Sequence, residues 1–143
     1  MIRTATLADA DALRDLHRRS SYIWEEDRPH FDAHPDIFGV DPAALAEGRT
    51  RIAVGDDGAT AGFATVTAAG ELEDLFVEPE LMRRGIGSEL VADAVARAAA
   101  AGHARMTVVA AERTRRFYER AGFVVESEAR TRFGPALHLA RPL

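Results

Sequence analysis

The segment from residue 71 to residue 90 holds the side chains whose types and spacing could do chemistry. Three carboxylates, Glu71, Glu73 and Asp74, lie on an expected strand. A carboxylate there could accept the proton of an attacking nucleophile, directly or through water. Regular alternation would put Glu71 and Glu73 on one face and Asp74 on the other, unless a bulge breaks it. We predict Glu71 and Glu73 as candidate catalytic bases, although solvated charges on a half-exposed strand would give the same pattern.

The run at 82–87, which follows this strand, could bind a phosphate group. The first N–H groups of a helix have no internal partners and carry partial positive charge, so a diphosphate can accept several of them. Gly85 and Gly87 would let the phosphate approach the backbone without a Cβ in the way, and Arg83 and Arg84 add charge. The run is neither a dinucleotide fingerprint nor a P-loop, and a glycine turn before an ordinary helix would look similar.

The rest of the chain supplies the elements that must position these groups. An antiparallel meander ends near residue 77, and a strand, helix and strand then suggest parallel neighbours. The prediction is one α/β (α+β) domain over residues 1–143, with a mixed, mostly antiparallel sheet of six or seven strands and about four helices. Strands are expected at 2–6, 51–54, 61–67, 72–77, 106–109, 124–126 and 136–140, and helices at about 9–19, 41–48, 85–101 and 114–120. Residues 20–41 show no regular pattern.

Two spaced motifs resemble those of the GNAT acetyltransferases. The run Met-Arg-Arg-Gly-Ile-Gly at 82–87 is similar to the family's pyrophosphate loop, Gln/Arg-x-x-Gly-x-Gly/Ala. The run Arg-Phe-Tyr-Glu-Arg-Ala-Gly-Phe at 116–123 is similar to the family's Phe-Tyr-x-x-x-Gly-Phe. The resemblance covers nearly the whole chain and is firmest over 70–123. It implies that acetyl-CoA lies between two splayed parallel strands.

Two positions depart from the family pattern. Met82 stands where Gln or Arg is usual, which is tolerable if that position contributes mainly a backbone N–H. Ala111 stands where many members carry Asn, which removes a side-chain contact.

The resemblance assigns most site residues. The backbone of 75–77 would pair with the pantetheine arm, and Arg115 would meet the 3′-phosphate unless it is a solvated helix residue. Tyr118 would protonate the leaving thiolate, since a phenol keeps its proton at pH 7, although it could merely pack in the core. The Val77 N–H would stabilise the oxyanion. The implied cofactor-binding residues are Leu75, Phe76, Val77, Met82, Arg83, Arg84, Gly85, Ile86, Gly87, Ser88 and Arg115.

Residues 20–41 are the predicted lid over the acceptor. Tyr22, Trp24 and Phe31 offer aromatic surface and Glu26 offers negative charge, a combination that suits a cationic amine. A dimer contact or plain packing would fit equally well. His30 and His34 have the spacing of a helical ligand pair, but no third ligand is evident, so no metal is expected.

Composition excludes several classes of function. The net charge of −5 argues against a nucleic-acid partner. The chain has no cysteine, so it has neither a disulfide framework nor a thiolate nucleophile, and it has no lysine for a Schiff base. No signal-peptide core and no run of about 20 apolar residues are present, so a cytoplasmic protein without a membrane segment is expected.

The leading hypothesis is therefore direct acetyl transfer from acetyl-CoA, as cosubstrate, to a primary amine of a small molecule or peptide. An alternative from another class is a catalytically silent CoA-binding sensor or regulatory domain, for which the missing Asn at Ala111 is the argument. A third is a structural partner domain that does not bind CoA. Members of the family are often dimers, so a homodimer is among the expected forms.

Overall fold

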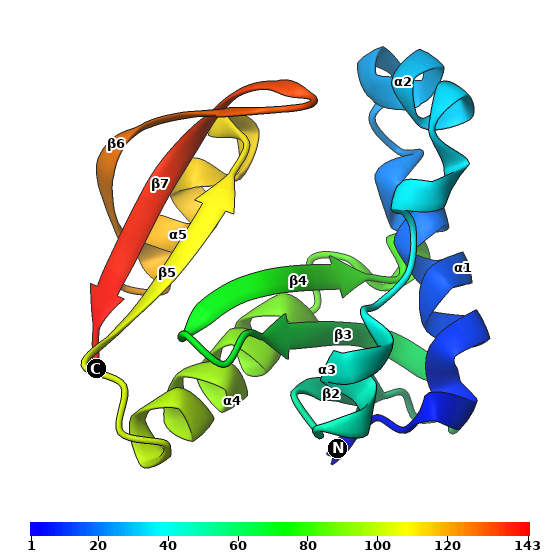
Figure 1. Cartoon of the computed structure of the whole chain (residues 1–143). Helices are drawn as coiled ribbons and strands as arrows, with labels where there is room; N and C mark the ends of the chain where they lie inside the picture. Colours follow the sequence, from blue (N-terminus) through cyan, green and yellow to red (C-terminus); the bar gives the residue numbers. More distant parts are fainter.

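The computed structural model describes all 143 residues as a seven-stranded sheet with helices on both faces (Figure 1). The strand order is β1-β2-β3-β4-β5-β7-β6, and only β4 and β5 run parallel. The strands are β1 (Ile2–Thr4), β2 (Thr50–Val54), β3 (Thr60–Val66), β4 (Glu71–Val77), β5 (Arg105–Ala110), β6 (Val124–Thr131) and β7 (Gly134–Pro142). The helices are α1 (Ala10–Ser21), α2 (Arg28–Ala33), α3 (Pro42–Ala46), α4 (Ile86–Ala100) and α5 (Arg115–Arg120). The predicted mixed, mostly antiparallel sheet is confirmed.

Strands β2 and β3, at the centre of the meander β1–β4, are buried on both faces. Ile52 and Phe63 pack with the buried leucines of α1. Their chain neighbours Ala53 and Ala64 pack on the other face, with the buried side chains of α4. Successive strand residues point to opposite faces, so neighbouring residues of one strand serve two cores. This double burial explains why β2 and β3 read as apolar runs with few charges.

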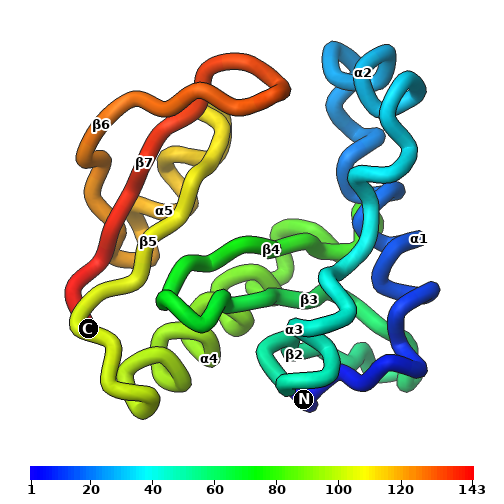
Figure 2. The backbone as a smooth tube through the Cα atoms, in the orientation of Figure 1, coloured from blue at the N-terminus to red at the C-terminus, as the bar shows by residue number.

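Strands β4 and β5 pair over only two residue pairs and then separate. Glu71 lies beside Thr107 and Leu72 beside Val108. Beyond this point β4 continues against β3 alone, and β5 continues against β7 alone. Figure 2 shows the result as two diverging arms, the green strands of the meander and the yellow to red strands of the C-terminal part.

Helix α4 holds the two arms together. Its buried residues belong to one apolar cluster that also contains Leu72 of β4, Met106 and Val108 of β5, and Leu139 of β7. Burying a side chain of this size contributes about 1.5–3 kcal/mol. The arms can therefore part along the strands while the core beneath them stays continuous.

A β-bulge in β4 decides which carboxylates share a face. Asp74 pairs with Thr65 of β3, and Leu72 pairs with the next residue, Val66. Glu73 lies between them and has no partner, so it is the extra residue of the bulge. Since Leu72 points into the α4 cluster, Glu71 and Asp74 both lie on the opposite face, toward α1. The alternation expected for an unbroken strand therefore does not hold.

Two segments differ from the sequence prediction. Residues 20–41, predicted without regular structure, contain α2 and short 3₁₀ turns, including one at Glu25–Asp27. Strand β6, predicted to end at residue 126, continues to Thr131 by pairing with β7. The outer residues of β6 are polar and mostly exposed, because it is an edge strand, so they show no alternation that sequence reading could detect.

Candidate active site

The glycine-containing run begins α4, as the sequence predicts. Gly85 is the N-cap residue. Because glycine has no side chain, no side-chain hydrogen bond caps the helix. The Glu89 N–H donates to the Gly85 carbonyl at 3.0 Å. The N–H groups of 86–88 thus precede the first helical acceptor and are free for an anion. Arg83 and Arg84 are exposed beside them, and neither forms an ion pair within the chain.

The two glycines of this run are required for different reasons. Gly85 has a φ of 86°, a conformation that L side chains rarely adopt, and a Cβ added there would meet no atom within 4 Å. A Cβ added at Gly87 would lie 3.2 Å from the ring of Phe117. Gly85 therefore fixes the turn, whereas Gly87 allows α4 to approach α5.

Beside this helix start, the edge of β4 that faces the gap has free backbone groups. The Glu78 N–H donates to the Ala61 carbonyl of β3 at 2.8 Å. In an antiparallel pair, alternate residues make these bonds, so the N–H groups of Leu75 and Val77 point away from β3. β5 has already diverged at this level, and these groups therefore face an open edge.

Asp74 lies at the end of a buried polar row that crosses three strands. The hydroxyls of Thr50 and Thr65 are 2.8 Å apart and fully buried, and Asp74 pairs with Thr65 on the next strand. Burial raises the pKa of Asp74 to about 6, the Thr65 hydroxyl opposes this shift, and the charges of Glu73 and Asp41 add to it. A carboxyl with this pKa is mostly ionised at pH 7 and is a ready proton acceptor.

The other two carboxylates have less distinctive surroundings. Glu71 is half-buried at the point where β4 and β5 still pair, and Glu73 is exposed on the bulge. Sequence reasoning weighed Asp74 with these two but chose Glu71 and Glu73. The signal that would have favoured Asp74 is the bulge, which has no marker in the residue types.

Tyr118 lies in α5 with its ring in the main core. It is 7% exposed, and its ring centroid is 5.1 Å from that of Phe117 and 5.7 Å from that of Phe123. Burial raises the pKa of Tyr118 to about 12. The only fully buried side-chain polar atom without a hydrogen-bond partner is His30 Nε2, so the Tyr118 hydroxyl is not sealed in the core. With its pKa raised to about 12, the Tyr118 hydroxyl carries a proton at neutral pH.

The predicted lid, residues 20–41, reaches from the end of α1 to the C-terminal arm through its aromatic side chains. The Phe31 ring, 7% exposed, has its centroid 5.7 Å from Tyr22, 5.5 Å from Phe38 and 5.6 Å from Phe133. Phe133 belongs to the β6–β7 turn, so the lid contacts the far arm (Figure 1). Sequence analysis did not identify Phe133, because no local pattern links a turn residue to a lid about a hundred residues earlier.

Arg113 forms a second link between the lid and the C-terminal arm. Its guanidinium lies 4.1 Å from the centroid of the Trp24 ring. It also donates to Asp27 at 2.8 Å and to Glu26 at 3.3 Å. These contacts tie the 3₁₀ turn at Glu25–Asp27 to the turn that precedes α5.

A match to a family model decides which family this fold belongs to. A family model described as an acetyltransferase (GNAT) domain matches residues 42–138, a range that contains the β4 edge, the start of α4, and Tyr118. The chain belongs to the GNAT acetyltransferase family. No curated protein sequence matches the chain.

Solved GNAT structures share the fold over the whole chain. The GCN5-related N-acetyltransferase from Rhodopseudomonas palustris has a TM-score of 0.84 at 22% identity, covering 100% of this chain and 95% of that one. The PaiA N-acetyltransferase from Thermoplasma acidophilum, in complex with coenzyme A, has a TM-score of 0.75 at 19% identity, covering 100% and 98%. The ribosomal-protein-S18-alanine N-acetyltransferase from Escherichia coli has a TM-score of 0.71 at 19% identity, covering 99% and 92%.

The lid of this GNAT protein uses its charges internally. Glu26 is engaged by Arg113, and the Tyr22 hydroxyl donates to Asp32. Arg115 lies near Glu112 and Glu119 of its own segment, at 3.5 Å from each. Glu26 and Arg115 thus already have partners within the chain, whereas Arg83 and Arg84 have none.

Two further findings concern the whole GNAT chain. It has no group of three or more His, Cys, Asp or Glu side chains that could hold a metal ion. None of its helices has the length and apolar character needed to cross a membrane.

The contacts of Arg113 predict a test of the lid. Arg113→Ala should weaken lid docking by about 1–2 kcal/mol, because a cation–π contact and exposed ion pairs are lost. Trp24 is the only tryptophan, so its emission should shift to the red and its quenching by acrylamide should increase. The matched control is Arg116→Ala, since Arg116 is exposed on the same segment and forms no ion pair. Equal spectra for both variants would contradict the link.

Proposed function

We propose that this GNAT protein transfers the acetyl group of acetyl-CoA directly to a primary amine of a small molecule or peptide. The observation that carries the proposal is the early separation of β4 and β5 beside the free N-terminus of α4. The family assignment supports it. Two structural neighbours that were solved with coenzyme A also support it: PaiA and the N-acetylglutamate synthase from Neisseria gonorrhoeae.

The chain offers groups for three parts of coenzyme A, namely the diphosphate, the pantetheine arm and the thioester. A diphosphate would accept the N–H groups of 86–88, with Arg83 and Arg84 at the rim. The amides of the pantetheine arm would pair with the free edge of β4 at 75–77, as an extended ligand adds to a sheet edge. Val77, the last residue of this edge, would aim its N–H at the thioester oxygen.

The chemistry then requires two proton transfers by residues of this chain. Bound acetyl-CoA supplies the acetyl thioester. Asp74 would accept the proton that the amine loses as its nitrogen bonds to the carbonyl carbon, directly or through water. Tyr118 would donate its proton to the sulfur as the carbon–sulfur bond breaks, and the products are an amide and free CoA. Their pKa values, about 6 and about 12, are those of an acceptor and a donor at neutral pH.

The first prediction concerns the cofactor loop. Acetyl-CoA at 100 times its Kd should stabilise the wild-type protein by about 2.7 kcal/mol, seen as a rise in Tm. Gly85→Val should abolish that rise, because a side chain at a φ of 86° distorts the turn that presents the N–H groups. Gly58→Val is the matched control, since Gly58 has a φ of 81° in a hairpin turn and similar open space. A normal rise in the Gly85 variant would contradict the loop assignment.

The second prediction concerns Tyr118. Tyr118→Phe should lower kcat by roughly 10- to 1000-fold and leave the Tm rise with acetyl-CoA nearly unchanged, because only the proton donor is removed. Steady-state release of free thiol measures the rate. Unchanged turnover would remove Tyr118 from the chemistry. Binding of acetyl-CoA with no turnover in wild type, over a broad panel of amines, would favour the silent sensor.

The third prediction separates Asp74 from the other two carboxylates. Because the pKa of Asp74 rises from 3.8 to about 6 on folding, the wild-type protein loses stability as the pH rises through that interval. Asp74→Asn should therefore be more stable than wild type at pH 8, by up to about 3 kcal/mol, and should lose that advantage near pH 4. Urea denaturation at both pH values measures this difference.

The same variant should be nearly inactive. Wild-type kcat/KM should fall as the pH drops through 6, and Asp74→Asn should lack that limb of the pH profile. Glu71→Gln and Glu73→Gln are the controls. Normal activity in Asp74→Asn with loss in Glu71→Gln would transfer the base to Glu71.

A further inference from the structure

The outer edge of β6 is an open side of the sheet. β6 is the last strand in the order and pairs only with β7. Figures 1 and 2 show it at the outer margin of the C-terminal arm. A strand in this position presents unpaired N–H and C=O groups, which form a template for another strand. The residues on this edge therefore determine what can bind there.

A proline in β7 fixes which residues of β6 face outward. Arg130 pairs with Pro135. Proline has no N–H, so these two residues cannot be a hydrogen-bonded pair, in which each residue donates to the other. The two kinds of pair alternate along an antiparallel ladder, so Ala129 bonds to Ala136 of β7. The backbone groups of Glu128 and Arg130 therefore point away from β7, toward the open side.

The usable part of this edge is short and symmetric about Ala129. On one side a bulge leaves Glu126 without a partner, and a bulge of this kind interrupts pairing. On the other side the tight turn to β7 begins at Arg132. The two neighbours of Ala129, Glu128 and Arg130, are exposed and form no ion pair within the chain. A negative and a positive charge thus lie on either side of the centre of the edge.

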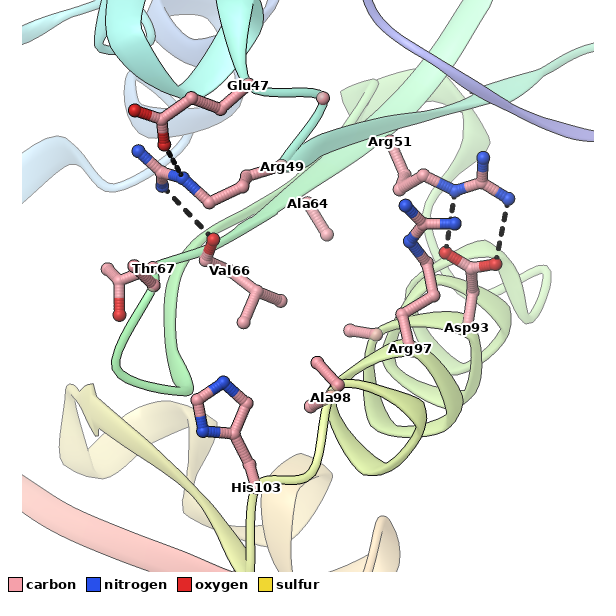
Figure 3. Close-up of a pocket in the computed structure, with 14 residues that line it drawn as sticks. Glu47, Arg49, Arg51, Ala64, Val66, Thr67, Asp93, Arg97, Ala98 and His103 are labelled. Carbon is pink, nitrogen blue, oxygen red and sulfur yellow. Dashed lines mark hydrogen bonds and ion pairs between the residues drawn. The ribbon is translucent and has the colours of Figure 1, made fainter.

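Two arginines in the groove between α4 and the meander show the contrast with surface charges that are already satisfied. Arg51 donates to both carboxylate oxygens of Asp93, at 3.0 and 3.1 Å (Figure 3). Arg49 donates to Glu47 at 2.7 Å (Figure 3). The two charged neighbours of Ala129 have no such partner, so their charges are available to another molecule.

We propose that β6 pairs with β6 of a second copy of this chain, antiparallel and about a two-fold axis at Ala129. In this register Glu128 lies opposite the partner's Arg130, and Arg130 lies opposite the partner's Glu128. Both residues present outward backbone groups, so each opposing pair is a hydrogen-bonded pair with Cα atoms about 5.5 Å apart. Side chains that lie directly opposite share one face of the sheet, so the unlike charges meet. The two-fold axis makes every one of these contacts occur twice.

The charges on the edge disfavour the neighbouring registers. Outward groups must face outward groups, so the axis passes through a residue and not between two. An axis at Glu128 would place that residue opposite the partner's Glu128, and an axis at Arg130 would place two arginines opposite each other. An axis at Ser127 would place Glu126 opposite the partner's Glu128. Like charges directly opposite are destabilising, so charges that commonly protect an edge leave one register open here.

The first test is the state of association of the purified full chain. Sedimentation velocity over concentrations up to about 1 mM, the range of weak complexes, should show a monomer–dimer equilibrium. Glu128→Arg and Arg130→Glu should each weaken the dimer by about 10-fold or more, because each change creates two pairs of like charge. Asp56→Arg is the matched control, since Asp56 is exposed in the turn between β2 and β3 and undergoes the same change of charge as Glu128→Arg.

Combining the two changes tests the register. A chain that carries both Glu128→Arg and Arg130→Glu should dimerise like the wild type, because every opposing pair again has unlike charges. An equimolar mixture of the two single variants should form a heterodimer for the same reason. An interface elsewhere on the molecule predicts neither result. Circular dichroism and Tm show that each variant is folded.

Amide hydrogen exchange tests the backbone pairing. In the monomer the N–H groups of Glu128 and Arg130 face solvent, whereas the Ala129 N–H is bonded to β7. A rise in protein concentration should therefore slow exchange at residues 128 and 130 and leave residue 129 unchanged. NMR of the labelled full chain at low and high concentration measures all three amides.

The outcomes are decisive in both directions. Association that both single variants lose, that the double variant restores and that protects the two outward amides supports the interface. A monomer at every concentration, an equally strong dimer in Glu128→Arg, a folded double variant that stays monomeric, or a dimer without protection of those amides would overturn the proposal. The interface goes beyond the proposed function and does not depend on it, because acetyl-CoA binding is followed separately by the rise in Tm.

Discussion

The separation of β4 from β5 after two residue pairs is the constraint on which the rest of the structure depends. A strand edge with unpaired N–H and C=O groups is costly unless water, another strand or a ligand satisfies it. In this protein the exposed edge is short, and it ends where α4 begins with further free N–H groups. Because α4 fills the space under both arms, the gap can persist without dividing the core. A ligand that is both extended and anionic satisfies both sets of donors at once.

The same strand carries an electrostatic cost. The bulge at Glu73 turns Asp74 toward the buried face, where burial outweighs the opposing effect of the Thr65 hydroxyl. A folded protein gains no stability from holding a carboxylate in this position. Such a position is understandable if the carboxylate must accept a proton near neutral pH. Natural proteins commonly carry strain or unfavourable burial where function requires it.

The predicted lid shows how segments far apart in the sequence come into contact. Arg113 joins Trp24 and Asp27, while Phe133 joins Phe31, so both contacts bring the N-terminal lid to the C-terminal arm. Arg113 pairs with Glu26 and Asp27, which are acidic residues of the segment whose charge suggested a cationic acceptor. The charge of this segment by itself is therefore a weak guide to the acceptor.

The sequence by itself determined the parts of this protein that depend on local patterns. Helical spacing, glycines and the order of strands predicted a mixed, mostly antiparallel sheet, and the runs at 82–87 and 116–123 predicted the family and the start of α4. These features follow from neighbouring residues, which share one backbone conformation and one periodicity. The full extent of β6 was not predicted. This polar edge strand is held in place by its pairing with β7, and its residue types give no strand pattern.

Only the tertiary structure decided which side chains meet. A single extra residue in β4 moved Asp74 to the face of Glu71, and a bulge changes side-chain direction without a distinctive residue type. The partners of Arg113 lie some 90 residues away in the chain, and Phe31 meets Phe133 about a hundred residues later. Pairings of this kind depend on long-range packing, for which one sequence carries no local signal.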